Sequence, residues 1–233
     1  MIELQNVTKK YGRKTILDQV SITFKKGKIS CLLGLNGVGK STTMKSIMGL
    51  VPITKGRILL EGKPLNEKNI DQIAFLADIP TFELNSTIEE NLQTANMFYS
   101  AFDLNKAESM ADFFRLPMKK RLKELSKGNL ARFNILISMS RNAPYVLMDE
   151  PFSGIDIFQR EEFIASLKTR FMTEGQTIVI TTHEIDEIES IADEIIVMEE
   201  GQILTIFSKE EAEQEGHTIV EKLRTIYRGG KLA

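Results

Sequence analysis

The glycine-rich segment at residues 34–42, GLNGVGKST, constrains the fold of this chain more than any other feature. It fits the pattern G-x-x-x-x-G-K-[ST], whose fixed positions are Gly34, Gly39, Lys40 and Ser41. A short, mostly apolar run precedes the segment, and residues 40–48 have helical spacing. Because glycine lacks a Cβ atom, successive backbone N–H groups can turn toward phosphate oxygens at the start of the helix. The segment therefore predicts a phosphate-binding loop between a buried strand and a helix, in preference to a plain glycine turn.

In such a loop, particular side chains are expected to contact phosphate and metal. Lys40 is expected to contact the β- and γ-phosphates of a nucleotide, and Ser41 to offer its hydroxyl to Mg²⁺. The residues expected to bind the nucleotide here are Asn36, Gly37, Gly39, Lys40, Ser41 and Thr42.

Two adjacent carboxylates follow a second apolar run, YVLMDE, at residues 145–150. The carboxyl ends of parallel strands are where open α/β sheets bind ligands. Asp149 can hold Mg²⁺ through water, and Glu150 can orient or deprotonate an attacking water molecule. The alternative is that both residues merely begin a loop, but the phosphate-binding loop elsewhere in the chain favours the catalytic interpretation.

The apolar pattern before residue 85 and after residue 140 predicts strands. Val20, Ile22 and Phe24 alternate with polar residues, which is typical of a strand with one buried face. Further strands are expected at Ile29–Leu33, Tyr145–Met148, Thr177–Ile180 and Glu194–Met198. Helices between the later strands are expected to carry Ile164, Leu167 and Phe171, and then Ile185, Ile188 and Ile191. This alternation predicts a parallel sheet covered by helices.

Residues 85–140 show helical signals instead. Ser86 and Glu89 have the spacing of a capping box, and Asp103 can cap another helix. Leu130, Phe133 and Ile137 recur at helical spacing. We therefore expect a helical insertion in this part of the chain.

Composition limits the remaining possibilities. A chain of 233 residues with 42% hydrophobic residues can bury one sizeable core with a subdomain. Its formal net charge of −2 argues against a general nucleic-acid-binding protein, which needs a basic face. The single cysteine, Cys31, excludes an intramolecular disulfide, and the start of the chain lacks the order of a secretory signal, so we expect a cytoplasmic location. The apolar runs are too short to span a bilayer, and another chain would have to supply any pore.

Taken together, the motifs resemble those of the ATP-binding subunits of ABC transporters over roughly residues 1–207. The matching segments, in the family's order, are Tyr11 (adenine stacking), Gly34–Thr42 (Walker A), Leu125–Asn129, LSKGN (signature), Tyr145–Glu150 (Walker B), Ser153–Asp156 (D-loop) and His183 (switch histidine). The resemblance implies an α/β P-loop NTPase fold of the ABC ATPase type. Its core sheet would be mostly parallel, with an N-terminal antiparallel β subdomain and an inserted α-helical subdomain at about residues 85–140. The ATPase domain would occupy residues 1–208, followed by a short C-terminal helical extension at residues 209–233.

The resemblance also implies a function. The chain would hydrolyse ATP with Mg²⁺ to power a separate transmembrane permease, which is expected to be a bacterial exporter. It would be peripheral on the inner face of the cell membrane. It would form a head-to-tail dimer with itself or with a paralogous ATPase subunit. Glu150, His183 and Lys40 would be catalytic, and Ser126 and Gly128 would contact the γ-phosphate bound by the partner. The metal site would comprise Ser41, Asp78 and Asp149, although Asp78 stands where the family usually has glutamine.

Two other classes of function stay open on these residues. Asp78, Lys127 and Asn129 depart from the family's usual residues, so an ATP-dependent dimerising clamp or regulatory module with slow hydrolysis is one alternative. A kinase using the same loop is another, but the helical insertion has no use in it and no acceptor site is evident. Steady ATP turnover, abolished by Glu150→Gln, would separate the ATPase from the clamp.

Overall fold

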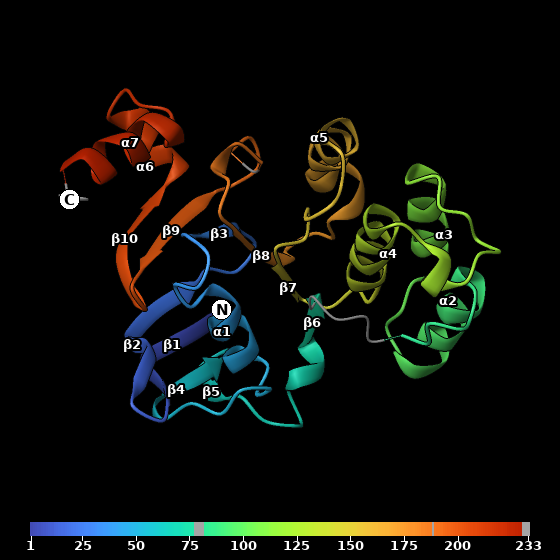
Figure 1. Cartoon of the computed structure of the whole chain (residues 1–233), viewed down its shortest axis with the longest axis horizontal. Coiled ribbons are helices and arrows are strands. Elements are labelled where there is room, and N and C mark those ends of the chain that lie inside the picture. The colour runs from blue at the N-terminus through green and yellow to red at the C-terminus, as the bar shows by residue number, and fades with distance from the viewer. Residues whose placement is uncertain (77–81, 188, 230–233) are drawn as a thin grey trace.

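The structure, a computed structural model, describes residues 1–76, 82–187 and 189–229. Within these residues the strands form two sheets (Figure 1). The first is antiparallel, in the order β2-β1-β4-β5, and comprises β1 (Ile2–Tyr11), β2 (Lys14–Phe24), β4 (Lys55–Leu60) and β5 (Lys63–Pro64). Val20, Ile22 and Phe24 are buried, which confirms the predicted alternation in β2.

The second sheet holds six strands in the order β10-β9-β3-β8-β7-β6. They are β3 (Ile29–Leu33), β6 (Ile73–Leu76), β7 (Tyr145–Asp149), β8 (Thr177–Thr182), β9 (Glu194–Glu199) and β10 (Gln202–Ser208). All neighbouring pairs are parallel except β9 and β10. The mostly parallel core sheet and the antiparallel N-terminal subdomain are both confirmed.

Every residue of β3, β7 and β8 is buried because the six-stranded sheet is covered on both faces. On one face, α1 (Lys40–Ile47) lies between the two sheets, where Met44 and Ile47 join the core of the antiparallel sheet. The opposite face carries the larger core, to which α4 (Lys127–Ser140) and α5 (Ile157–Ser166) contribute. The strands are therefore sandwiched between two apolar layers.

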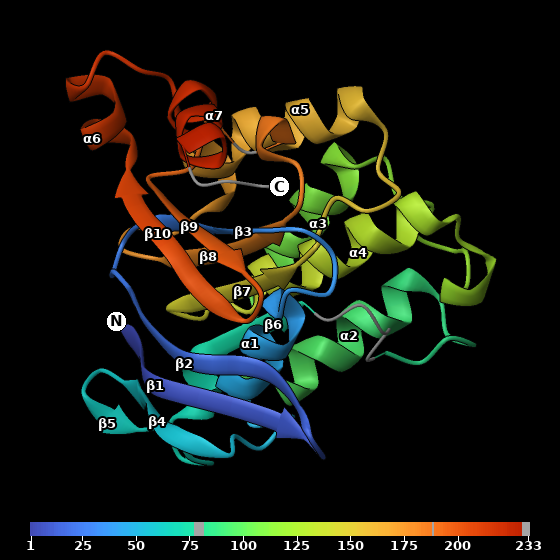
Figure 2. The same ribbon diagram turned by 60° about the vertical axis from the view of Figure 1, so that its left-hand side comes forward.

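The helical insertion lies to one side of the sheets (Figures 1 and 2). It contains α2 (Ile88–Phe98), α3 (Leu104–Phe113), the short 3₁₀ turn Leu122–Glu124, and α4. Asp103 caps α3 as expected, its side chain accepting from the backbone N–H of Lys106. The predicted capping box is wrong by one residue, because Thr87 and Glu90 form it. The carbonyl oxygen of Ser86 accepts a hydrogen bond from the backbone N–H of Leu122.

Two other expectations differ from the structure. The helix predicted from Ile185 and Ile191 is wrong: only the 3₁₀ turn Ile185–Glu187 forms, the following described residues are turns, and Ile188 lies outside the described residues. The helix carrying Ile164 ends at Ser166, and a π-helical turn, Leu167–Phe171, continues it.

The C-terminal helices are α6 (Lys209–Gln214) and α7 (Ile219–Gly229). These helices lie in the segment where the sequence predicts a short helical extension, and α7 buries Ile219 and Leu223 in the larger core. None of the helices in the described part of the chain combines the length and apolar character that crossing a bilayer requires.

Candidate active site

The glycine-rich loop joins the buried end of β3 to the first turn of α1. Gly39 precedes the helix with φ 117°, a conformation that side chains rarely adopt. A Cβ atom at Gly39 would lie 2.8 Å from Leu17 Cδ2, and one at Gly34 would lie 2.4 Å from the carbonyl oxygen of Met198. Both glycines are therefore required by close packing. Between them, Asn36 and Gly37 are exposed, so the middle of the loop faces solvent.

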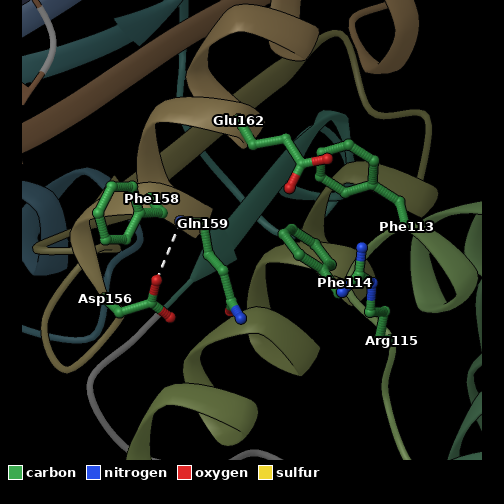
Figure 3. Close-up of a pocket in the computed structure, with 7 residues that line it drawn as sticks. All are labelled: Phe113, Phe114, Arg115, Asp156, Phe158, Gln159 and Glu162. Atoms are coloured by element: carbon green, nitrogen blue, oxygen red, sulfur yellow. Dashed lines mark hydrogen bonds between the residues drawn. The ribbon is translucent and has the colours of Figure 1, made fainter.

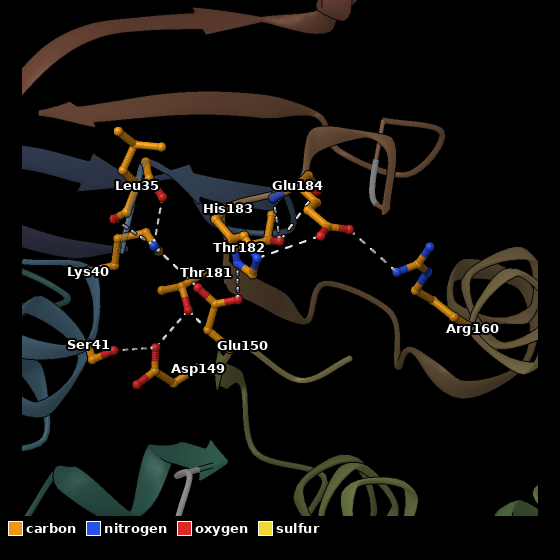
Figure 4. A network of polar contacts seen from close by, with 11 residues as sticks. Leu35, Lys40, Ser41, Asp149, Glu150, Arg160, Thr181, Thr182, His183 and Glu184 are labelled. Atoms are coloured by element: carbon orange, nitrogen blue, oxygen red, sulfur yellow. Dashed lines mark hydrogen bonds and ion pairs between the residues drawn. The ribbon is translucent and has the colours of Figure 1, made fainter. Parts of the chain in front are cut away.

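Lys40 folds back into its own loop. Its side chain is only 4% exposed, and its Nζ donates to the carbonyl oxygens of Gly34 (2.7 Å) and Leu35 (3.2 Å). The same Nζ lies 3.2 Å from Glu150 Oε1 (Figure 4). The ammonium group of the loop and the carboxylate that follows β7 are thus directly paired, although 110 positions separate them in the sequence.

Asp149 lies at the end of β7, fully buried, and contacts the first turn of α1. Its Oδ1 accepts hydrogen bonds from Ser41 Oγ (3.0 Å) and Thr181 Oγ1 (2.7 Å). Its Oδ2 is buried and makes no hydrogen bond in the described part of the chain. A buried carboxylate oxygen without a donor is costly, and a hard cation prefers oxygen ligands of this kind. Ser41 and Asp149 therefore fit a Mg²⁺ ion.

Glu150 connects this group to His183. Its Oε2 lies 3.0 Å from Nδ1 of His183, and its backbone N–H donates to Thr181 Oγ1 (2.9 Å). The residue has φ 46°, which a non-glycine residue rarely adopts, and which here turns its side chain toward Lys40 and His183. A carboxylate held at two points beside a phosphate-binding loop is suited to hold a water molecule in line.

The structure thus brings together most of the predicted site. Lys40, Ser41, Asp149, Glu150 and His183 form one continuous polar network (Figure 4). Thr42 is half-buried in the first turn of α1. Tyr11 ends β1 with 53% of its surface exposed and Lys9 Nζ 4.5 Å from its ring centroid, so one face of its ring is occupied. Asp78 lies outside the described residues.

Ser126 and Gly128 lie elsewhere, at the start of α4. Ser126 is exposed and caps the helix by accepting from the backbone N–H of Asn129. In the described part of the chain neither residue makes a hydrogen bond to the glycine-rich loop of its own chain. Gly128 packs against the loop after β7, since a Cβ atom there would lie 2.6 Å from the carbonyl oxygen of Gly154. Burial lowers the pKa of the nearby Arg132, and the charge of Asp156 partly opposes this shift.

Asp156 closes that loop by capping α5, its side chain accepting from the backbone N–H of Gln159 (3.1 Å). A cavity of about 270 Å³ separates this first turn of α5 from the end of α3 (Figure 3). Its walls include Phe113, Phe114 and the 79% exposed Phe158. The first turn of α5 is therefore loosely packed on this side.

Sequence reasoning missed several neighbours of the site. Thr181, which bridges Asp149 and Glu150, and Glu184 were visible only as parts of the segment TTHE. Arg160 of α5 belongs to no motif that would have identified it from the sequence. The structure also places α7 beside the site: a cavity of about 490 Å³ is lined by Leu35 and His183 on one side and by Leu223 of α7 on the other.

An α/β sheet with a glycine loop between β3 and α1, and paired carboxylates after β7, defines a P-loop protein. Comparison with known proteins makes this more specific. The family model for "ABC transporter" matches residues 17–153. The lantibiotic transport ATP-binding protein SrtF of Streptococcus pyogenes is 31% identical over 96% of this chain and 95% of that protein. The bacitracin transport ATP-binding protein BcrA of Enterococcus faecalis is 33% identical over 88% of this chain and 68% of that protein.

A solved structure described as the ATP-binding subunit of an ABC transporter has a TM-score of 0.85 and 25% identity, covering 98% of both chains. The chain belongs to the ABC transporter family. The likeness extends over nearly the whole chain, and it includes the antiparallel subdomain and the helical insertion.

Proposed function

We propose that this chain is an ATPase subunit that binds and hydrolyses ATP and thereby powers a separate transmembrane permease. The observation that carries the proposal is the convergence of Lys40, Ser41, Asp149, Glu150 and His183 at the carboxyl ends of the parallel strands β3, β7 and β8. Loop amides and an ammonium group suit a triphosphate, and a carboxylate–histidine pair suits the positioning of water.

Binding of ATP requires Lys40 to change partners. Its Nζ leaves the carbonyl oxygens of Gly34 and Leu35 and the carboxylate of Glu150, and moves to the β- and γ-phosphates. Glu150 is then free to accept a hydrogen bond from a water molecule while His183 holds its second oxygen. Tyr11 supplies a ring surface for the adenine, and Asn36, Gly37, Gly39 and Thr42 complete the loop around the phosphates.

When bound, Mg²⁺ neutralises phosphate charge as the bond to the leaving group breaks. Ser41 and Asp149 would hold the ion from the chain's side, and the buried Oδ2 of Asp149 is the atom that supports this assignment. Asp78 is proposed as a further metal-directed carboxylate. Thr181 keeps Asp149 oriented by donating to its other oxygen.

A second protomer would complete the site. Ser126 and Gly128 belong to the start of a 14-residue helix, where backbone N–H groups and the helix dipole favour a phosphate. Since these residues do not bond to the loop of their own chain, we propose that they contact the γ-phosphate held by a partner in a head-to-tail dimer. The partner is a second copy or a paralogous ATPase subunit.

The transported substrate is proposed from the relatives. Their printed names concern lantibiotic transport, bacitracin transport and, in Bacillus subtilis, linearmycin resistance. We infer that this chain serves a bacterial exporter of an antimicrobial peptide or antibiotic, docked on the permease at the cytoplasmic face of the membrane.

The test is phosphate release from ATP by the purified chain, alone and with its permease. Wild type should turn over ATP with Mg²⁺, Lys40→Ala should lose nucleotide binding, and Glu150→Gln should bind ATP but lose turnover by at least about a hundredfold. Gel filtration of the Glu150→Gln variant with ATP should show a dimer. Binding and dimerisation without measurable turnover in wild type would instead favour an ATP-dependent clamp.

A further inference from the structure

His183 is flanked by carboxylates on both ring nitrogens. Nδ1 lies 3.0 Å from Glu150, and Nε2 lies 3.6 Å from Oε1 of the adjacent Glu184. The other oxygen of Glu184 lies 4.0 Å from Nη1 of Arg160, which comes from α5 (Figure 4). A continuous series of polar contacts therefore runs from α5 through Glu184 to His183.

Arg160 is the more buried member of its pair with Glu184. Its side chain is 17% exposed, whereas Glu184 is 58% exposed. Its backbone N–H donates to the carbonyl oxygen of Asp156 in the first turn of α5. A half-exposed carboxylate next to a largely buried guanidinium loses conformational freedom, and the imidazole that it faces is restrained in turn.

Helix α5 also contacts the start of α4 through the turn that precedes it, and the start of α4 is the segment that we propose binds the ATP held by the partner. The turn before α5 places Gly154 against Gly128, with so little space that a Cβ on Gly128 would overlap the Gly154 carbonyl oxygen. A displacement of the start of α4 must therefore move the turn before α5. The cavity beside Phe158 leaves the first turn of α5 room to follow.

We propose that Arg160 and Glu184 are positioning residues that hold His183 against Glu150 and transmit a shift of α5 to the hydrolytic site. Each protomer would contribute its P-loop to one ATP and its signature segment, at the start of α4, to the other. The contacts from Gly128 through Gly154 and α5 to His183 would then link the two sites within one chain. This inference deepens the proposed ATPase function and rests on it.

Kinetics of the full chain with MgATP test the pair. A partly exposed pair at this distance contributes up to about 1 kcal/mol, which corresponds to about a fivefold change in rate. Arg160→Met and Glu184→Gln should each lower kcat about three- to fivefold and leave KM for ATP within twofold. The double variant should be no slower than either single variant, and Arg160→Lys should restore most of the rate. The control is Glu161→Gln, which removes an exposed charge from the same helix and should keep the wild-type kcat.

Nuclear magnetic resonance tests the positioning directly and independently of turnover. The chain has only two histidines, His183 and His217, so His217→Gln leaves a single set of ring signals. In that background, Glu184→Gln and Arg160→Met should both shift the ring ¹⁵N signals of His183 at fixed pH, whereas Glu161→Gln should leave them in place.

Unchanged His183 signals in the Arg160→Met variant would overturn the proposal, as would additive losses of kcat in the double variant. A loss expressed in KM alone would also contradict it, because that result indicates weaker ATP binding. If wild type hydrolyses no ATP, the proposed function fails, and the ring signals still decide whether Arg160 and Glu184 hold His183.

Discussion

The Glu150→Gln substitution removes the carboxylate that now holds Lys40. The two groups are 3.2 Å apart, with Lys40 4% exposed and Glu150 21% exposed, so water weakens their interaction little. The bond to the carboxylate and the bond to the neutral amide that replaces it both involve the charged ammonium group and therefore fall within about 1.5 to 3 kcal/mol; the first lies near the upper end of this range and the second near the lower end. In the variant, Lys40 should therefore lose about 1 to 1.5 kcal/mol less when it moves from residue 150 to a phosphate, and a non-hydrolysable Mg-nucleotide should bind about 5- to 13-fold more tightly.

Isothermal titration calorimetry measures this change. Glu184→Gln is the matched control, because it removes the same charge one residue beyond His183 without touching Lys40. Its dissociation constant should stay within about twofold of wild type. The reasoning is refuted if Glu150→Gln binds the nucleotide no more tightly than wild type, or if Glu184→Gln tightens binding equally.

Three further predictions follow from other parts of the structure. Gly39→Ala should weaken nucleotide binding at least tenfold, because its Cβ would meet Leu17. Gly37→Ala should lose less in the same titration, because its Cβ would meet no described atom within 4 Å and only the positive φ of 84° opposes it. Thr181→Val removes the donor to Asp149, and should lower kcat about tenfold with KM nearly unchanged; an unaltered kcat would contradict this role. Burial lowers the pKa of Lys106 from 10.5 to about 8. Between pH 8 and 10.5 the Lys106 side chain is protonated in the unfolded chain and neutral in the folded chain. The free energy of unfolding therefore increases as pH rises through that range. Lys106→Met should therefore be about 1 to 2 kcal/mol more stable than wild type in urea at pH 7, with partial exposure allowed for, and the advantage should vanish above pH 10.5; equal stabilities at pH 7 would contradict it.

The local parts of the fold were predictable from sequence. The glycine loop, β3 and α1 follow one another within 20 residues, and alternating or continuous apolar runs marked β2, β7, β8 and β9. The capping box shows the limit of such local patterns. Ser86 with Glu89 and Thr87 with Glu90 have the same spacing, so the spacing alone does not decide between them. Long-range contacts surround this helix start, among them the bond from the Leu122 N–H to the Ser86 carbonyl oxygen, 36 positions away.

The incorrectly predicted helix at residues 185–191 shows that isoleucine spacing alone is ambiguous. Ile191 is buried in the larger core, so its apolar character fits a helix or a loop equally well. The Glu189 side chain accepts from the backbone N–H of Val220 at the start of α7, so this turn is in contact with a helix that lies about 30 positions further along the chain. Nothing in the spacing of isoleucines could reveal that α7 packs at this point.

The residues of the candidate site that belong to a sequence motif were predictable. The residues that reach the site only through the folding of the chain were not. Lys40, Ser41, Asp149 and His183 each belong to a recognisable segment. Arg160 and Glu184 are ordinary charged residues in sequence, and their relation to His183 appears only when α5 and the end of β8 come together. The same holds for Thr181, whose two hydrogen bonds span adjacent strands.

The most direct test of the account is a crystal structure with Mg²⁺ and a non-hydrolysable ATP analogue. We expect Lys40 Nζ to leave the Gly34 carbonyl oxygen and Glu150 for the β- and γ-phosphates, with the metal beside Ser41 and the Oδ2 side of Asp149. A nucleotide bound elsewhere, or a triphosphate in the loop with Lys40 still paired to Glu150, would contradict the account.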